Sequence, residues 1–264
     1  MNQNAPIEAN FLPPSLLGRP DDWALFLDID GTLLDIAERP DGVEIPASLT
    51  SDLQKASARL GGAMALISGR AMDWIDRAFC PLRLPAAGQH GAEIRLSANG
   101  PVFTPRGANL DGVRVRVRGL ARTAGIEIED KGLSIAIHYR HARLDRREAA
   151  ALIATTLGTL SDDLEILPGQ FVYDIKPRGV NKGTAIARLA ALPPFIGRKP
   201  VFVGDDHTDR DGFREVLERG GIAIQVGPSP AEPGCQWLPN PAAMREWLAR
   251  LSAAPTGSSA ARRR

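Results

Sequence analysis

Apolar residues occur along the chain in short unbroken runs, and the first two runs are separated by a helix-like pattern. Residues 23–27 read W-A-L-F-L and residues 63–67 read A-M-A-L-I, which is typical of strands buried on both faces. Between them, residues 47–60 place leucine and alanine at helical spacing before two glycines, which are common just past a helix end. This order predicts a parallel sheet, and we expect an α/β fold with a Rossmann-like, doubly wound core.

The same kind of pattern returns in the last third of the chain. It predicts a helix over residues 184–192, a strand over 200–203, a strand over 222–226 as the last of the core, and a closing helix over 242–251. Before that, Asn99-Gly100 lies between two short alternating runs, which predicts a hairpin within residues 84–104.

The stretch from residue 108 to residue 174 interrupts the core pattern. Residues 109–123 contain V-R-V-R-V-R, whose alternation favours a strand although the flanking leucines would also suit a helix. Beyond them the pattern predicts strands over 126–128 and 133–139, a helix over 145–160, and a hairpin of 164–167 with 171–175. We therefore expect core residues 1–107, an inserted α+β domain over 108–174, core residues 175–252, and a disordered tail over 253–264.

Composition and charge narrow the class of protein. With 264 residues, 44% of them hydrophobic and 24% charged, the chain can bury an ordinary core. Lys and Arg number 32 against 31 for Asp and Glu, which argues against a nucleic-acid partner and against an acidic membrane surface. The N-terminus lacks a secretory signal, and no apolar run reaches the ~18 residues of a membrane span. The two cysteines, Cys80 and Cys235, fit a reducing compartment, although the sequence also allows one disulfide between them. We expect a cytoplasmic protein that is a monomer.

Two carboxylates, Asp28 and Asp30, directly follow the first predicted strand. In an open α/β sheet this is the edge where ligands bind. Two carboxylates so close together repel each other unless a cation or a shared proton offsets the charge, which favours a divalent metal. An acidic pair after a strand can also be a solvated turn or a helix N-cap, so this pattern alone leaves both interpretations open.

The second predicted strand ends in Ser68-Gly69-Arg70, which we expect at the same edge. Ser68 taken alone is a cap for a helix over residues 71–79, and a phosphate-binding serine could serve in both ways. The turn G-Q-H-G at 88–91 could be a binding loop, although His90 could equally be a structural histidine with satisfied hydrogen bonds.

Lys182 lies at the start of the helix predicted over 184–192. A surface lysine is the default interpretation, but a cation near a helix N-terminus is electrostatically misplaced unless an anion accompanies it. The strand over 200–203 then ends in a second acidic cluster, Asp205, Asp206 and Asp209. We expect these groups, Asp28, Asp30 and Ser68 to lie together at one edge of the sheet.

This combination has a chemical logic for phosphoryl transfer. A carboxylate can act as nucleophile and form an acyl phosphate, which divides a difficult hydrolysis into two easier steps. Mg²⁺ held by a few carboxylates can offset the repulsion between anions. A serine hydroxyl and a lysine, here Ser68 and Lys182, can bind the non-bridging phosphate oxygens.

The motifs D-I-D-G-T-L (28–33), S-G-R (68–70), N-K-G (181–183) and G-D-D-H-T-D (204–209) resemble the four motifs of the haloacid dehalogenase superfamily. Within it, the chain resembles the trehalose-6-phosphate phosphatase family. That closer resemblance rests on A-L-I-S-G-R (65–70), G-Q-H-G-A-E (88–93), H-Y-R (138–140), I-K-P-R-G (175–179) and G-R-K-P-V-F-V-G-D-D (197–206), and it covers nearly everything from residue 23 to residue 227.

The resemblance implies hydrolysis of trehalose 6-phosphate to trehalose and phosphate. Asp28 would be the nucleophile, and Asp30 would protonate the departing sugar and then activate water. Mg²⁺ would be held by the Asp28 side chain, the Asp30 backbone carbonyl and Asp205, with Asp206 and Asp209 nearby. The inserted unit would be a mobile cap that closes over the disaccharide, and the resemblance favours the helical interpretation of residues 109–123.

The resemblance also implies a set of substrate contacts. Besides Asp28 and Asp30, we expect the core to contact the substrate through Gly69, Arg70 and His90. The cap would contribute Glu129 and Lys131 from its first predicted turn, and Asp174. The family usually has glutamate at the last of these positions, so the shorter Asp174 is a departure from its pattern.

Three other functions are compatible with parts of the pattern. A phosphatase for another sugar phosphate, such as sucrose phosphate, would share the core motifs, because these do not choose the leaving group. A signalling receiver domain also uses an acidic pair, a hydroxyl, a lysine and an aspartyl phosphate, but it needs no inserted cap and no second acidic cluster. A sugar transferase could use Asp28 and Asp30 to hold a metal nucleotide, yet it would give Lys182 no role.

Overall fold

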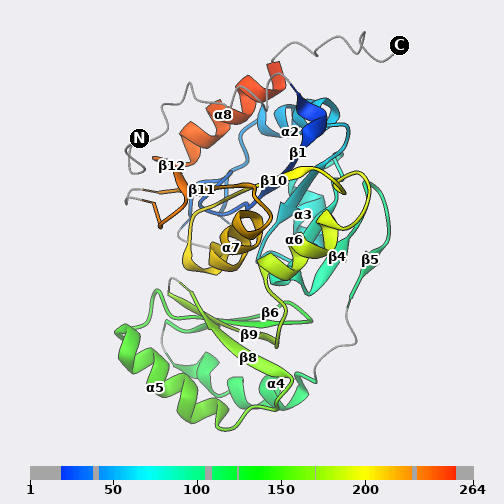
Figure 1. Cartoon of the computed structure of the whole chain (residues 1–264). Helices are drawn as coiled ribbons and strands as arrows, with labels where there is room; N and C mark the ends of the chain where they lie inside the picture. The colour runs from blue at the N-terminus through cyan, green and yellow to red at the C-terminus, as the bar shows by residue number, and fades with distance from the viewer. Residues whose placement is uncertain are drawn as a thin grey trace, which may run out of the picture.

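A computed structural model describes residues 19–37, 42–104, 109–123, 125–169, 171–227 and 231–253 of the chain. Within these ranges the backbone forms two separate sheets, one of eight strands and one of four, each with its own helices (Figure 1). Residues 1–18 and most of the predicted tail lie outside the described residues, as does the segment 105–108 at the expected start of the insertion.

The larger sheet has the order β12-β11-β10-β1-β2-β3-β4-β5. Its strands are β1 (Trp23–Leu27), β2 (Met64–Ile67), β3 (Ala86–Gly88), β4 (Glu93–Arg95), β5 (Val102–Phe103), β10 (Lys199–Gly204), β11 (Ile222–Val226) and β12 (Gln236–Leu238). The pairs from β12 to β3 are parallel, and β3, β4 and β5 pair antiparallel. The chain runs outward from β1 in both directions, so β1 lies at the switch point where α/β sheets bind ligands.

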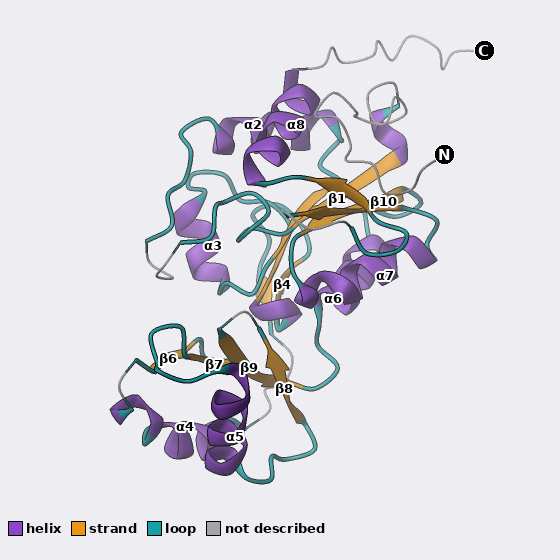
Figure 2. Cartoon of the chain, turned by 90° about the vertical axis from the view of Figure 1, so that its left-hand side faces the viewer, coloured by secondary structure: helices purple, strands orange, loops and turns teal. Residues whose placement is uncertain are grey.

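Alternate residues of β1 anchor the two faces of this sheet. Leu25 and Leu27 belong to the hydrophobic cluster under α2 (Leu49–Arg59), α3 (Met72–Ala78) and α8 (Pro241–Ala253). Ala24 and Phe26 belong to the cluster under α6 (Lys182–Ala190) and α7 (Arg210–Glu218). Figure 2 shows these two groups of helices on opposite sides of β1 and β10. The sheet is therefore covered on both faces, as a doubly wound fold requires.

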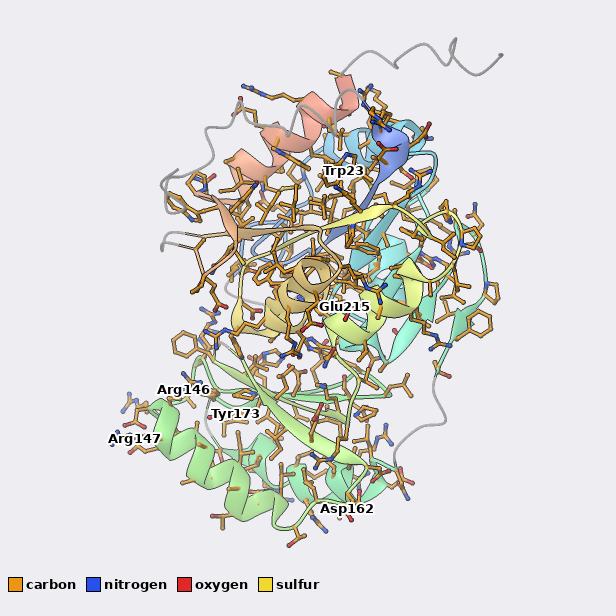
Figure 3. The ribbon with its side chains drawn as sticks, in the orientation of Figure 1. Trp23, Arg146, Arg147, Asp162, Tyr173 and Glu215 are labelled. Atoms are coloured by element: carbon orange, nitrogen blue, oxygen red, sulfur yellow. The ribbon has the colours of Figure 1, made fainter. Side chains whose placement is uncertain are left out.

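The second sheet has the order β6-β7-β9-β8 and is antiparallel throughout. Its strands are β6 (Glu127–Asp130), β7 (Ile135–His138), β8 (Leu164–Pro168) and β9 (Val172–Pro177). One face carries Ile135, Ile137, Tyr173 and Ile175 and packs on α4 (Asp111–Val117) and α5 (Arg146–Leu157); Figure 3 labels Tyr173 on β9 and Arg146 at the start of α5. The intervening residues therefore point to the other face, toward the larger sheet.

Four short 3₁₀ helices complete the described elements: η1 (Pro20–Asp22), η2 (Gln89–Gly91), η3 (Leu120–Arg122) and η4 (His207–Asp209). No helix in the described part of the chain is long and apolar enough to cross a membrane. Cys80 and Cys235 are free thiols, so the bridge that the sequence left open is not formed.

Most predicted elements are confirmed within a few residues, two expectations need correction, and one open choice is decided. Residues 222–226 are not the last core strand, because β12 follows and pairs with β11. The V-R-V-R-V-R stretch, for which alternation favoured a strand and the resemblance favoured a helix, forms helix α4. Val113 and Val117 are buried in the hydrophobic cluster of the second sheet, whereas Val115 is 64% exposed. Glu129 lies on strand β6 and not in the turn that follows it.

Candidate active site

Asp28 is the first residue after β1 and is buried between β2 and β10. Its backbone N–H donates to Val203 O at 2.9 Å, which extends the β1–β10 pairing by one residue. The loop then turns sharply, with the carbonyl of Ile29 accepting the N–H groups of Leu33 and Leu34. Gly31 makes the turn possible, because its φ is +77° and a Cβ there would lie 2.0 Å from a carboxylate oxygen of Asp205.

Lys182 is brought to Asp28 by helix α6. Asn181 caps the helix by accepting the N–H of Thr184 at 2.8 Å, which directs the buried Lys182 side chain inward. Lys182 Nζ donates to Asp28 Oδ1 at 2.7 Å and to Asp209 Oδ1 at 2.6 Å. Burial alone would lower the pKa of Lys182, but Asp209 and Asp28 raise it well above its usual value, so the side chain is a cation.

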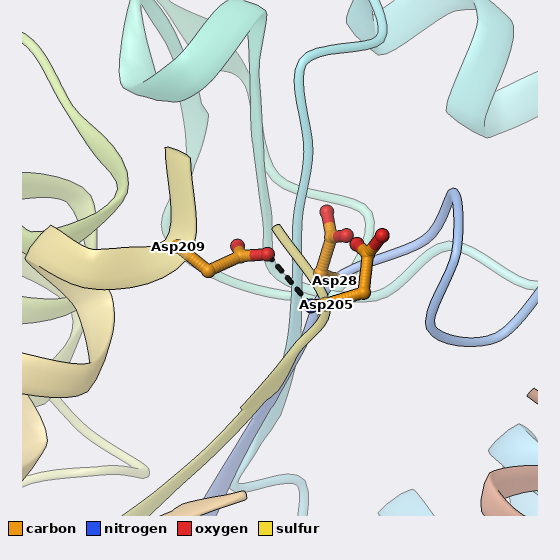
Figure 4. A group of neighbouring side chains, drawn as sticks. All are labelled: Asp28, Asp205 and Asp209. Atoms are coloured by element: carbon orange, nitrogen blue, oxygen red, sulfur yellow. Dashed lines mark hydrogen bonds between the residues drawn. The ribbon is translucent and has the colours of Figure 1, made fainter. Parts of the chain in front are cut away.

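Three carboxylates form an acidic cluster beside this lysine. Asp28, Asp205 and Asp209 each place an oxygen within 4.8 Å of the others (Figure 4). The second oxygen of Asp209 accepts the backbone N–H groups of Asp205 at 2.8 Å and Asp206 at 3.1 Å. Both oxygens of Asp209 therefore have donors, which makes Asp28 and Asp205 the carboxylates of the cluster best able to bind a cation.

The electrostatics of the cluster fit a hard divalent cation. Burial, opposed by Lys182 and aided by Asp209, raises the pKa of Asp28 to about 8. Burial and the charges of Asp28 and Asp209 raise the pKa of Asp205 to about 10. Two carboxylates that resist ionisation side by side are stabilised as anions by a bound metal, and oxygen-only donors suit Mg²⁺.

Asp30 and Arg70 form a two-point ion pair across the pocket. Arg70 Nε donates to Asp30 Oδ2 at 2.8 Å and Arg70 Nη2 to Asp30 Oδ1 at 2.6 Å. The Ser68 hydroxyl oxygen accepts the N–H of Arg70 at 3.1 Å. Ser68 is not the cap of the following helix, because α3 begins after Ala71 without a side-chain cap. The hydroxyl of Ser68 instead lines the pocket.

The second sheet contributes a network of charged groups on its inward face. Lys131 Nζ donates to Asp174 Oδ1 at 3.2 Å and to the carbonyl of Gly69 at 3.3 Å, and it lies 3.9 Å from Glu129 Oε2. Burial would raise the pKa of Asp174, but Lys131 and His90 hold it well below its usual value. Asp174 is therefore a buried anion, and its contacts join the second sheet to the core.

His90 lines the pocket, but it is not the structural histidine with satisfied hydrogen bonds that the sequence also allowed, because its buried Nδ1 has no hydrogen-bond partner among the described residues. It has a left-handed backbone (φ +58°), is 7% exposed, and its Nε2 lies 3.7 Å from Asp174 Oδ2. Burial lowers its pKa, so the imidazole is neutral near pH 7. The ring packs on Gly69, where a Cβ would come within 2.7 Å of it. His90 is therefore a packed residue that also borders the pocket.

All the predicted site residues line a single pocket between the two sheets. They are Asp28, Asp30, Ser68, Gly69, Arg70, His90, Glu129, Lys131, Asp174, Lys182 and Asp205. Together with its mouth, which is open to solvent, the pocket contains roughly 1200 Å³ of space free of protein atoms. Residues distant in sequence thus meet where the core chemistry and the second sheet face each other.

The pocket also contains residues that the sequence interpretation did not assign to it. They include Ile36, Glu127, His138, Arg140, His141 and Phe171. His138 Nε2 lies 3.1 Å from Glu129 Oε2. The alternation of β7, in which Ile135 and Ile137 face the helices, was the signal that would have placed His138 on the pocket side.

Comparisons with known proteins agree with this geometry. The trehalose-phosphatase family model matches residues 26–234. A probable trehalose-phosphate phosphatase of Sinorhizobium fredii is 43% identical over 236 residues, which cover 88% of each chain. The trehalose-6-phosphate phosphatase of Escherichia coli is 40% identical over 209 residues, covering 78% of this chain and 77% of that one.

The fold agrees as well. A solved structure of a trehalose-6-phosphate phosphatase related protein matches with a TM-score of 0.69 and 26% identity, covering 87% of this chain and 96% of its own. Phosphatases of the haloacid dehalogenase superfamily share the architecture. Because the family model and both relatives match over most of its length, this chain belongs to the trehalose-phosphatase family.

Proposed function

We propose that the protein hydrolyses trehalose 6-phosphate to trehalose and phosphate through an aspartyl phosphate. The observation that carries the proposal is the meeting of two kinds of group in one pocket. Asp28, Lys182 and the acidic cluster lie on the core side, and the polar network of Glu129, Lys131 and Asp174 lies on the other. Membership of the trehalose-phosphatase family supports this choice of substrate.

In the first step, a carboxylate oxygen of Asp28 attacks phosphorus and the bond from phosphorus to the sugar oxygen breaks. Asp30 gives its proton to that oxygen, so trehalose leaves as an alcohol. Arg70 pairs with both oxygens of Asp30 in the structure, so Asp30 acts as the acid only after one of these oxygens is freed and protonated in the substrate complex. Lys182 and the Ser68 hydroxyl hold the phosphoryl oxygens, where negative charge must be stabilised.

In the second step, water attacks phosphorus of the aspartyl phosphate and the acyl bond to Asp28 breaks. Asp30, now a carboxylate, takes the proton of that water, and phosphate and free Asp28 result. Mg²⁺ would be held by the Asp28 and Asp205 side chains and the Asp30 carbonyl, where it would neutralise charge between the phosphate and the carboxylates. Asp209 would orient Lys182 and the backbone of residues 205 and 206.

The second sheet would act as a cap that selects the leaving group. Its inward residues Glu129, Lys131 and Asp174 are suited to sugar hydroxyls, because they offer both acceptors and a donor. Lys131 Nζ donates hydrogen bonds to Asp174 and to the carbonyl of Gly69. Hydroxyl groups would exchange with these contacts, so Asp174 could serve despite being shorter than the family's usual glutamate.

The test is release of phosphate and free trehalose from trehalose 6-phosphate by the purified protein with MgCl₂. Sucrose 6-phosphate, glucose 6-phosphate and p-nitrophenyl phosphate are measured in parallel, and EDTA should abolish turnover. The proposal requires the highest kcat/KM for trehalose 6-phosphate. A higher value for sucrose 6-phosphate would assign the enzyme to another sugar phosphate, and no release from any substrate would contradict phosphatase activity.

The proposal includes a cytoplasmic monomer with no nucleic-acid or membrane partner. The balanced charge of 32 basic against 31 acidic residues supports the absence of a nucleic-acid partner. Size-exclusion chromatography with light scattering tests the oligomeric state.

A further inference from the structure

We propose that Phe171 is the platform on which the second sugar ring of the substrate stacks, the ring that does not carry the phosphate. The inference rests on the proposed function, since it concerns a disaccharide phosphate in the same pocket. Phe171 lies at the turn between β8 and β9 and lines the pocket, yet it is 43% exposed. Pockets for organic ligands are lined by aromatic and apolar side chains together with a few polar groups, which fits a binding role for Phe171.

The exposed fractions divide the lining of the pocket into a buried part and an open part. Asp28 and Lys182 are each only 3% exposed, and the side chains of Lys131 and Asp174 are 10% and 8% exposed. Phe171 at 43% and Ile36 at 54% form the open end. We place the phosphate in the buried part, at Asp28, and the second sugar ring in the open part, beside Phe171.

The backbone of Phe171 is in a conformation that an aromatic residue adopts only under constraint. Its φ is +60°, in the left-handed region that glycine and asparagine tolerate and bulky side chains avoid. The turn is held in place, because Tyr139 N donates to Phe171 O at 2.9 Å and Gly169 N donates to Val172 O at 2.7 Å. Unfavourable backbone conformations that the surroundings enforce are concentrated at functional sites.

The surroundings of the ring suit a sugar. A pyranose presents C–H groups on its face, which pack on an aromatic ring, and hydroxyl groups at its edge. The Arg140 guanidinium lies over one face of the Phe171 ring, 5.0 Å from its centroid, so the sugar ring stacks on the opposite face or displaces the guanidinium, whose N–H groups can donate to sugar hydroxyls. Tyr139, 5.9 Å away between centroids, supports the ring from within the second sheet. The turn also contacts the core, since His207 is hydrogen-bonded to Pro168 O.

The experiment compares Phe171→Ala, Phe171→Asn and Phe171→Trp with the wild-type enzyme. The readout is kcat/KM for trehalose 6-phosphate divided by kcat/KM for p-nitrophenyl phosphate, which has no second sugar ring. We expect this ratio to fall roughly 10- to 100-fold in the Ala and Asn variants and to be largely retained with Trp. The same ratio with glucose 6-phosphate in place of trehalose 6-phosphate should change by less than about threefold.

Thermal unfolding separates a binding role from a folding role. Asparagine accepts a positive φ, so Phe171→Asn should melt at or above the wild-type temperature while losing the preference for the disaccharide. Phe103→Ala is the matched control, because Phe103 on β5 is equally exposed, at 44%, and does not line the pocket. Its substrate ratio should equal that of the wild type.

Two outcomes would overturn the inference while leaving the proposed function in place, provided that the wild-type enzyme hydrolyses trehalose 6-phosphate. In the first, the substrate ratio of Phe171→Ala stays within twofold of the wild-type ratio. In the second, Phe171→Ala loses the same factor of kcat/KM for all three substrates. If the wild-type enzyme releases no phosphate from trehalose 6-phosphate, the proposed function fails first and the inference falls with it.

Discussion

Asp28 and Asp209 share the same lysine but differ in what their other oxygens do. Asp209 directs its second oxygen to two backbone N–H groups, whereas the second oxygen of Asp28 has, among the described residues, only the Thr32 hydroxyl at 3.4 Å. Asp28 is therefore held on one side and available on the other. A nucleophile needs this combination, because it must be positioned and still free to attack.

The first prediction concerns Asp28. Asp28→Asn should lose ~10³-fold or more in kcat, because an amide neither attacks phosphorus nor binds Mg²⁺ well. The fold should persist, since Lys182 retains Asp209 as a partner. Phosphate release and circular dichroism measure the two effects. Asp35→Asn, in an exposed carboxylate of the same loop region, is the control; a tenth of wild-type turnover in Asp28→Asn would remove Asp28 from the mechanism.

The second prediction joins pH to metal binding. The pKa values of Asp28 and Asp205, about 8 and about 10, lie above the ~4 of an unfolded chain. The metal-free folded state therefore retains protons that the unfolded state releases, so the contribution of these two groups to its stability is complete below about pH 4 and is lost as the pH rises toward those values. Mg²⁺ binds the ionised pair, so its stabilising effect should grow over the same range.

Melting temperatures with MgCl₂ and with EDTA, at about pH 6 and about pH 8.5, test this coupling. We expect the larger difference at the higher pH, and Asp205→Asn should reduce it at both. An equal Mg²⁺ effect at the two pH values would mean that the carboxylates are already ionised in the metal-free protein.

At the scale of elements, β9 is the piece of chain that leads from the second sheet back to the core. Lys176 near its end is 1% exposed, and its ammonium donates to Glu165 on β8 and to the carbonyl of Val180. Val180 lies just before the capping residue of α6. One buried lysine thus ties the second sheet to the loop that positions Lys182.

The third prediction follows from this tie. Lys176→Met should lower the free energy of unfolding by about 2–4 kcal/mol, because it leaves Glu165 and the Val180 carbonyl without their donor. The Glu165 side chain is 31% exposed, so water can replace its partner and Glu165→Gln should cost about 1 kcal/mol or less. Urea unfolding compares the two variants. Equal stability of both would show that the buried lysine does not anchor the loop.

Local sequence patterns predicted most helices and strands, but they could not decide between a helix and a strand where one stretch satisfies the periodicity of both. The V-R-V-R-V-R stretch alternates as a strand does. In the structure, however, Val113 and Val117, which lie one helical turn apart, are both buried in the hydrophobic cluster of the second sheet. Tertiary packing decided between them. The edge strand β12 is short and half-buried, so its pattern carries little signal, and α7 contains an internal glycine that weakens its helical pattern.

At the scale of the whole molecule, the two sheets are held together through the strained turn at Gln89. Gln89 is fully buried with φ +47°, and its side-chain oxygen accepts Leu133 N at 3.2 Å and Ser134 Oγ at 2.9 Å. These contacts fix the turn of the second sheet that carries Lys131. They join residues far apart in the sequence, so no local pattern could have predicted them, although the motif around Gln89 located the turn itself.

The fourth prediction is that Gln89→Ala frees this turn. The Leu133 amide should exchange with deuterium about tenfold faster or more, because its acceptor is lost. The Lys131 amide is an internal reference, since it donates to Ser134 O within the second sheet and keeps that bond. Ser134→Ala, which leaves the Leu133 bond intact, should change the Leu133 rate less. Unchanged exchange at Leu133 would mean that other contacts hold the sheets together.

The alternation of residues between the two faces of the second sheet has a consequence for the evolution of substrate specificity. Residues that anchor α4 and α5 alternate with Glu127, Glu129, His138 and Val172, which face the pocket. Selection can therefore act on the two sets separately, since replacing a pocket-facing side chain opens no gap beneath the helices. A lineage can drift from one sugar to another through point substitutions on this face while it inherits the phosphoryl chemistry of the core unchanged.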